Sequence, residues 1–143
     1  VQMPGRFEVV GREPTVILDA AHNAAGARAC AETLREEFTL GGTIVMVAGF
    51  LEGRDPVEML DALGAADAGL LIACSPDSPR AIPAPRVAAA ADSLGVAAES
   101  VPTVDEAVRR AMGVASVDDL VLITGSLYVV GPARTALRAE VES

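Results

Sequence analysis

Polar side chains gather just after the first long apolar run, in residues 19–23 (Asp-Ala-Ala-His-Asn). Asp19 ends the run, the single histidine, His22, follows it, and Asn23 stands where it would cap the next helix. A carboxylate there can accept hydrogen bonds from a ribose diol, and a helix N-terminus suits an anion. The spacing therefore fits a nucleotide site, but it also fits a plain turn with His22 on the surface.

Two further polar residues could serve the same ligand. Arg6 follows a proline and a glycine, and an arginine fork after a turn suits a phosphate or a purine face. From the residues alone, a solvated arginine in an entry loop is the better explanation of Arg6. Ser126 comes directly after an apolar run and could hold a carboxylate, although a Gly-Ser pair is also an ordinary loop.

Several chemistries are excluded by the residue types present. All 11 basic residues are arginine, so the chain carries neither a P-loop lysine nor a Schiff-base lysine. One histidine with Cys30 and Cys74 cannot form the usual zinc site, and we expect no metal ligands. Cys74 could be a nucleophile only with His22, and a buried structural thiol explains it better. A G-x-G-x-x-G dinucleotide fingerprint is also missing.

Strand and helix patterns alternate along the chain. Branched apolar runs predict strands at residues 15–19, 43–49, 70–74, 97–101 and 120–124, with an edge strand at 7–10. Helical spacing predicts helices through residues 27–38 (closed by Gly41 and Gly42), after Asp55, from 86 to 94, after Thr103, and from Pro132 onward.

This alternation, with strands apolar on both faces, predicts one α/β domain over residues 1–143. We expect a three-layer Rossmann-like domain: a mostly parallel sheet of about five to six strands with helices on both faces. In such sheets the ligand lies beyond the carboxyl ends of the strands. Residues 19–23, 49–52, 74–76 and 124–126 would share that edge, so function is expected there.

Composition narrows the class of protein. The chain has 143 residues, of which 51% are apolar and 22% charged, enough for one globular core. Its net charge of −9 disfavours nucleic acid as a partner. The uncharged stretches are shorter than the roughly 20 apolar residues of a membrane span, so no membrane partner is expected. With unpaired cysteines and no secretory signal, we expect a cytoplasmic protein.

Residues 4–6, 19–23 and 124–131, in this order, resemble the C-terminal domain of bacterial folylpolyglutamate synthase/dihydrofolate synthase, a member of the Mur ligase superfamily. The resemblance runs over nearly the whole chain and includes the spacing of 13 residues between Arg6 and Asp19. The family usually has Asp-Gly-Ala-His-Asn-Pro, where this chain has Ala20 and Ala24 in place of glycine and proline. If that glycine adopts a positive φ, Ala20 is strained by about 1 kcal/mol.

The resemblance implies an ATP-dependent ligase that adds L-glutamate to a folate, either a tetrahydrofolate polyglutamate or dihydropteroate, through an acyl phosphate. An N-terminal P-loop ATPase domain of the same polypeptide, absent from this chain, would hold most of the Mg²⁺ contacts, so the chain alone should be inactive. Arg6, Asp19 and Asn23 would contact ATP. His22 would be a catalytic residue beside them, and Ser126 would lie near the incoming glutamate.

Two other functions fit the same fold, because fold alone does not fix function. One is a free-standing Rossmann-like module that binds a small molecule without catalysis. The other is the C-terminal domain of a Mur ligase that acts on a peptidoglycan precursor, which would keep Asp19 and Arg6 in similar roles.

Overall fold

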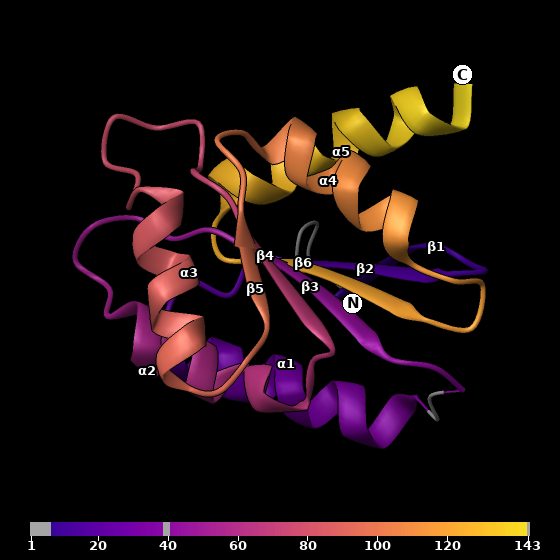
Figure 1. Ribbon diagram of the computed structural model, residues 1–143. Coiled ribbons are helices and arrows are strands. Elements are labelled where there is room, and N and C mark those ends of the chain that lie inside the picture. The colour runs from indigo at the N-terminus through magenta and orange to yellow at the C-terminus, as the bar shows by residue number, and fades with distance from the viewer. Residues whose placement is uncertain (1–6, 39–40, 143) are drawn as a thin grey trace.

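The computed structural model describes residues 7–38 and 41–142, with side chains through residue 140. The elements in chain order are β1 (Glu8–Gly11), β2 (Thr15–Asp19), α1 (Ala24–Glu37), β3 (Ile44–Ala48), α2 (Pro56–Ala62), the 3₁₀ helix η1 (Ala65–Asp67), β4 (Leu70–Ala73), α3 (Ala84–Ser93), β5 (Ala98–Ser100), α4 (Val104–Val114), β6 (Leu120–Thr124) and α5 (Leu127–Glu142) (Figure 1).

The sheet has six strands in the order β1-β2-β6-β3-β4-β5. Strands β2 to β6 run parallel, and β1 is an antiparallel edge strand on β2. The last strand, β6, lies between β2 and β3 and pairs with both. The predicted mostly parallel α/β sheet and its edge strand are confirmed.

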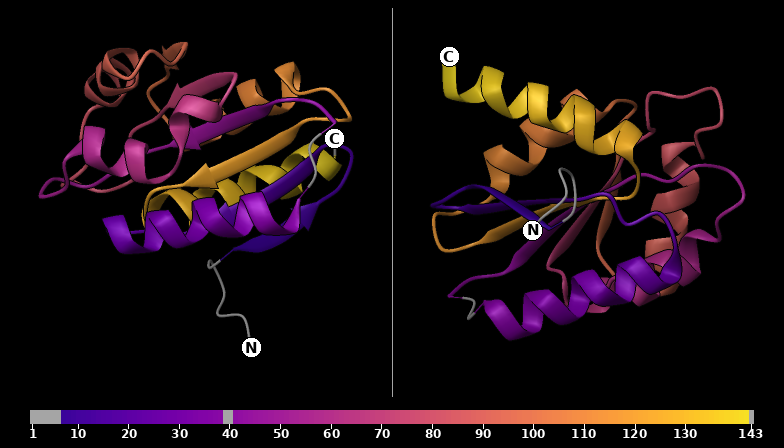
Figure 2. Two further views of the ribbon diagram at one scale, coloured as in Figure 1. Left: turned by 90° about the horizontal axis from the view of Figure 1, so that it is seen from below. Right: turned by 180° about the vertical axis from the view of Figure 1, so that it is seen from behind.

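Helices cover both faces of the sheet. One core cluster, which includes Ile17, Met46 and Leu122, packs under α1, α2 and α3. A second cluster, which includes Val47 and Ile123, packs under α4 and α5. Figures 1 and 2 show these two helical layers on opposite sides of the strands. In the described part of the chain, no helix is both long and apolar enough to cross a membrane.

The helix after β2 and the helix after β6 leave the sheet toward opposite faces, although the two strands are neighbours. Such a point is a topological switch point, where open α/β sheets leave a crevice beyond the carboxyl ends of their strands. Asp19 ends β2 and pairs in register with Thr124, which ends β6. The topology therefore places the ligand crevice beside Asp19.

The last helix begins earlier than the sequence predicts. Pro132 lies inside α5, which starts at Leu127 rather than at the proline. A proline inside a helix leaves the carbonyl four residues earlier without its usual donor. That carbonyl belongs to Tyr128, and it accepts a hydrogen bond from Asp77 N–H at 3.4 Å instead. The loop after β4, which contains Asp77, therefore supplies the hydrogen bond that Pro132 cannot donate.

The prediction that Gly41 and Gly42 close the first helix is also wrong. Helix α1 ends at Glu37, and Phe38 follows in an extended conformation with its N–H bonded to the Leu34 carbonyl. Gly42 instead passes close to Asp119, where an added Cβ would overlap the carboxylate oxygen. Its small size is needed at the start of β3, not at the end of α1.

Asp119 ties together the loops that precede β3 and β6. Its two carboxylate oxygens accept hydrogen bonds from Thr43 N–H at 2.9 Å and Ser116 N–H at 2.7 Å. These bonds, first that from Thr43, lower the pKa of Asp119 below its ordinary value of 3.8. A carboxyl with a lower pKa in the folded state stabilises the fold above its unfolded pKa, and this contribution is lost as the pH falls through the folded value.

We therefore expect Asp119→Asn to be less stable than wild type at neutral pH. The difference in unfolding free energy should stay constant down to about pH 5 and shrink below 3.8, the ordinary pKa of the group. Urea unfolding of both proteins across this pH range measures it. A difference that grows as the pH falls would contradict the assignment.

Candidate functional site

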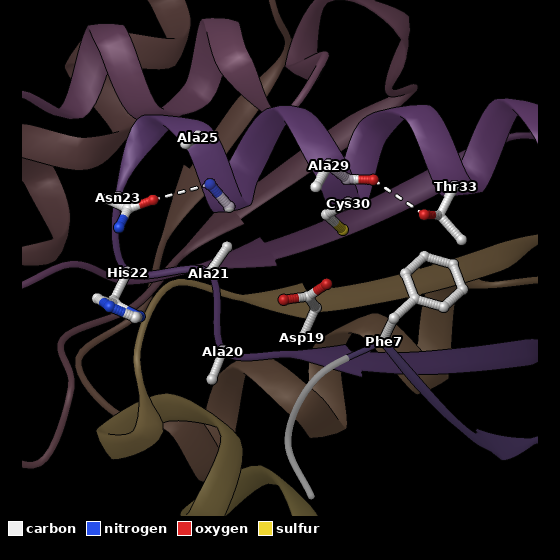
Figure 3. Close-up of a pocket in the computed structure, with 11 residues that line it drawn as sticks. Phe7, Asp19, Ala20, Ala21, His22, Asn23, Ala25, Ala29, Cys30 and Thr33 are labelled. Atoms are coloured by element: carbon white, nitrogen blue, oxygen red, sulfur yellow. Dashed lines mark hydrogen bonds between the residues drawn. The ribbon is translucent and has the colours of Figure 1, made fainter. Parts of the chain in front are cut away.

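A pocket of about 460 Å³ opens at the carboxyl end of β2, between that end, the start of β1 and one side of α1 (Figure 3). It lies at the switch point of the sheet. Its lining residues are Phe7, Asp19, Ala20, Ala21, His22, Asn23, Ala25, Gly26, Ala29, Cys30 and Thr33. Three residues predicted from sequence, Asp19, His22 and Asn23, are therefore brought together in one pocket.

Asp19 supplies the carboxylate of the pocket. It is only 8% exposed, yet it lines the pocket. Figure 3 shows its carboxylate and the Cys30 thiol pointing toward one another. The pKa of Cys30 lies well above the ordinary thiol value. Burial of the thiol is the largest cause, followed by the negative charge of Asp19 and a hydrogen bond with Asp19. The thiol therefore stays protonated and can donate to Asp19.

The start of α1 forms a second wall. Asn23 is the N-cap, and its side-chain oxygen accepts a hydrogen bond from Gly26 N–H at 2.8 Å. The first turn of this 14-residue helix has no acidic side chain, so nothing there neutralises the positive end of its dipole. His22 is exposed at the end of the pocket opposite Phe7 (Figure 3). The arrangement suits a ligand with an anionic group near α1.

The two other predicted site residues are Arg6 and Ser126. Arg6 lies outside the described residues. Ser126 is buried at the start of α5, and its hydroxyl oxygen accepts a hydrogen bond from Tyr128 N–H at 3.1 Å. It shares the functional edge of the sheet, since it lies two residues beyond Thr124, but it does not line the pocket.

Sequence reasoning missed two pocket residues, Phe7 and Cys30, and it placed Thr124 on the functional edge without making it a neighbour of Asp19. Phe7 reaches the pocket from the start of β1, and Cys30 reaches it from the inner face of α1. Thr124 is fully buried beside Asp19 in register, and within the described chain its hydroxyl oxygen has no hydrogen-bond partner. Cys30 carried a signal, since its helical spacing placed it inward. The direct pairing of Thr124 with Asp19 carried no signal, because it depends on the strand order.

The structure supports the structural reading of Cys74. It is fully buried after β4, its Sγ lies 3.7 Å from the Ala48 carbonyl oxygen, and burial raises its pKa to about 12. A thiol that stays protonated is a poor nucleophile.

The expected strain at Ala20 is absent. Of the described non-glycine residues, only Phe7 and Glu13 have positive φ values. Ala20 is instead a buried member of the core cluster on the α5 side of the sheet. The loop after β2 therefore accepts an alanine where the family usually has glycine.

A metal site would need a cluster of side chains that could bind the ion. Across 7–38 and 41–142, no group of three or more His, Cys, Asp or Glu residues could hold a metal ion.

The fold and the pocket define a Rossmann-like α/β domain with a pocket at its switch point. The model of the family described as "Mur ligase, glutamate ligase domain" matches residues 5–127, and this chain belongs to that family.

Similar proteins are larger than this chain. A "Probable bifunctional folylpolyglutamate synthase/dihydropteroate synthase" of Halobacterium salinarum is 41% identical over 133 residues, which are 92% of this chain and 16% of that protein. A bifunctional folylpolyglutamate synthase/dihydrofolate synthase crystallised with Mn, AMPPNP and L-glutamate has a TM-score of 0.84 at 31% identity, over 96% of this chain and 32% of that chain. The Mycobacterium tuberculosis folylpolyglutamate synthase complexed with ADP has a TM-score of 0.85 at 32% identity, over 94% of this chain and 32% of that chain.

Proposed function

We propose that this chain is the C-terminal domain of an ATP-dependent ligase that adds L-glutamate to a folate substrate. The observation that carries the proposal is the pocket at the end of β2, with Asp19 in its wall and the α1 N-terminus beside it, in a member of the glutamate ligase family. The names of the similar proteins favour a folate over a peptidoglycan precursor as substrate.

In this proposal the pocket binds the nucleoside part of ATP. The Asp19 carboxylate accepts hydrogen bonds from the ribose hydroxyls, and the α1 N-terminus faces negative charge. His22 is exposed at the end of the pocket away from Phe7, and in this proposal it is a catalytic residue beside the bound ATP. Arg6 contacts ATP from the entry segment, and Asn23 acts through the helix that it caps.

The reaction proposed has two steps. The substrate carboxylate attacks the γ-phosphorus of ATP, which gives an acyl phosphate and ADP. The glutamate amine then attacks the acyl carbon, loses its proton and displaces inorganic phosphate, which leaves an amide. Ser126 is proposed to lie near the incoming glutamate, on the same sheet edge as the pocket.

A partner domain completes the proposed site. The chain spans about a third or less of its relatives, so we propose that an N-terminal P-loop ATPase domain of the same polypeptide supplies the phosphate cradle and most Mg²⁺ contacts. Leu127 and Tyr128, 68% and 52% exposed at the start of α5, lie on the edge that this domain would close over. The isolated chain should then bind nucleotide but not catalyse ligation, because the charge at the transferred phosphoryl group stays unneutralised.

The test is ATP-dependent glutamate addition, followed by mass spectrometry of the folate product. The longer protein that contains this chain should extend tetrahydrofolate or dihydropteroate by glutamate and release phosphate, and this chain alone should not. Efficient ligation by the isolated chain would contradict the division of labour. Glutamate addition to a muramyl precursor alone would overturn the folate assignment.

A further inference from the structure

Phe7 closes one side of the pocket from a partly buried position just before an edge strand. It precedes β1, an edge strand that pairs with β2 only and whose register shifts between Val9 and Gly11. Its φ is 43°, in the left-handed region that an aromatic residue seldom adopts. Such a conformation persists only where the surroundings impose it. The ring contacts Phe38, with 6.0 Å between the ring centroids, and packs against the core on the α1 side.

A bidentate ion pair holds the next residue from the other side of the sheet. Arg134 on α5 donates from Nη1 to Glu8 Oε2 at 2.7 Å and from Nη2 to Glu8 Oε1 at 3.0 Å. The two side chains are 30% and 28% exposed, which makes this the least exposed of the three ion pairs found among the described residues. A planar fork on a carboxylate fixes orientation as well as distance.

The Phe7–Phe38 contact and the Glu8–Arg134 ion pair lie on opposite faces of the sheet, at the same end of β1. Glu8 pairs in register with Leu18, whose side chain belongs to the core on the α5 side. Phe7 packs against the core on the α1 side, where the pocket lies. The ion pair therefore pins the backbone at Glu8 while the neighbouring ring faces the pocket. Neither Glu8 nor Arg134 lines the pocket.

We propose that Glu8 and Arg134 are positioning residues, whose ion pair keeps Phe7 in place as a wall of the pocket. When the pair is broken, the start of β1 separates from the sheet more often, and the pocket loses that wall while the rest of the domain stays folded. The effect on nucleotide binding rests on the proposed function, but the effect on the pocket itself does not.

The two cysteines allow a test without nucleotide. Cys30 lines the pocket close to Phe7, and Cys74 is buried elsewhere in the core, so it reports global unfolding only. In the 143-residue chain, Arg134→Gln should raise the rate of Cys30 alkylation by iodoacetamide about five- to tenfold and leave that of Cys74 unchanged. Peptide mass spectrometry measures both rates.

Matched variants separate positioning from general stability. Arg110 makes a similar bidentate pair with Glu99 at 2.9 Å for both bonds, between α4 and β5 at the far edge of the sheet. Arg110→Gln should leave the alkylation rates of both Cys30 and Cys74 unchanged. Arg134→Lys, which keeps the charge but loses the fork, should be intermediate, and the exchange Glu8→Arg with Arg134→Glu should restore part of the protection.

Binding of ATP provides the second readout, by NMR titration of the same chain. Arg134→Gln should weaken binding about fivefold, while Arg110→Gln should stay within about twofold of wild type. Wild-type protection of Cys30 in Arg134→Gln, or an equal acceleration of both cysteines, would overturn the positioning role. If wild type fails to bind ATP while Arg134→Gln still exposes Cys30, the positioning role stands and the proposed function fails.

Discussion

Replacing Gly125 by alanine should destabilise the domain by about 3 kcal/mol or more. Gly125 follows β6 with a φ of 133°, a conformation that is strained for any residue with a side chain. An added Cβ would also overlap the carbonyl oxygen of Gly49 and lie 2.8 Å from its carbonyl carbon. Both partners are backbone, so neither can rotate away. Denaturant unfolding of Gly125→Ala against wild type measures the loss.

Gly131→Ala is the matched control for this change. Gly131 lies within α5, is exposed, and an added Cβ would have no neighbour within 4 Å. The same substitution should therefore stabilise the helix by about 0.5–1 kcal/mol. A Gly125→Ala protein that unfolds within about 1 kcal/mol of wild type would show that the turn after β6 can move apart from Gly49.

Asp19→Asn should weaken ATP binding to this chain about tenfold or more, because a hydrogen bond to a charged group contributes about 1.5–3 kcal/mol. Asparagine keeps the size of the side chain, so the pocket should keep its shape. The chain has a net charge of −9, and ATP is also an anion, so removing one negative charge should by itself strengthen binding. A lower affinity would therefore report the lost acceptor, not the changed net charge.

Asp92→Asn provides the charge control for Asp19→Asn. Asp92 is exposed on α3, away from the pocket residues, and its replacement removes the same charge. We expect ATP affinity in Asp92→Asn to equal or slightly exceed that of wild type. Equal affinities for wild type and both variants would remove Asp19 from the nucleotide site.

Local patterns in the sequence predict most elements of the fold. The runs that end at Asp19 and Thr124 are strands because they are short, branched and apolar on both faces. Thr103 caps α4 as predicted, with its hydroxyl accepting from Glu106 N–H at 3.2 Å. The start of α5 was mispredicted because the partner that satisfies the carbonyl freed by Pro132 lies about fifty residues away in sequence.

The candidate site was predicted only as far as it is local. Asp19, His22 and Asn23 lie within five residues, so any turn after the strand keeps them together. Thr124 and Phe7 reach Asp19 through strand pairing, and the strand order cannot be inferred from hydrophobic spacing. Glu8 and Arg134 are 126 residues apart in sequence, and their ion pair forms only because α5 packs on the face of the sheet to which Glu8 points.

The most direct measurement is a titration of the ¹⁵N-labelled chain with ATP, followed by NMR. We expect the largest chemical-shift changes on the amides after β2 and in the first turns of α1, from Asp19 to Gly26, and on Phe7. We expect small changes around the separate hollow between Ser75 and Ser100. Changes centred on that hollow, or no changes at saturating ATP, would contradict a nucleotide site beside Asp19.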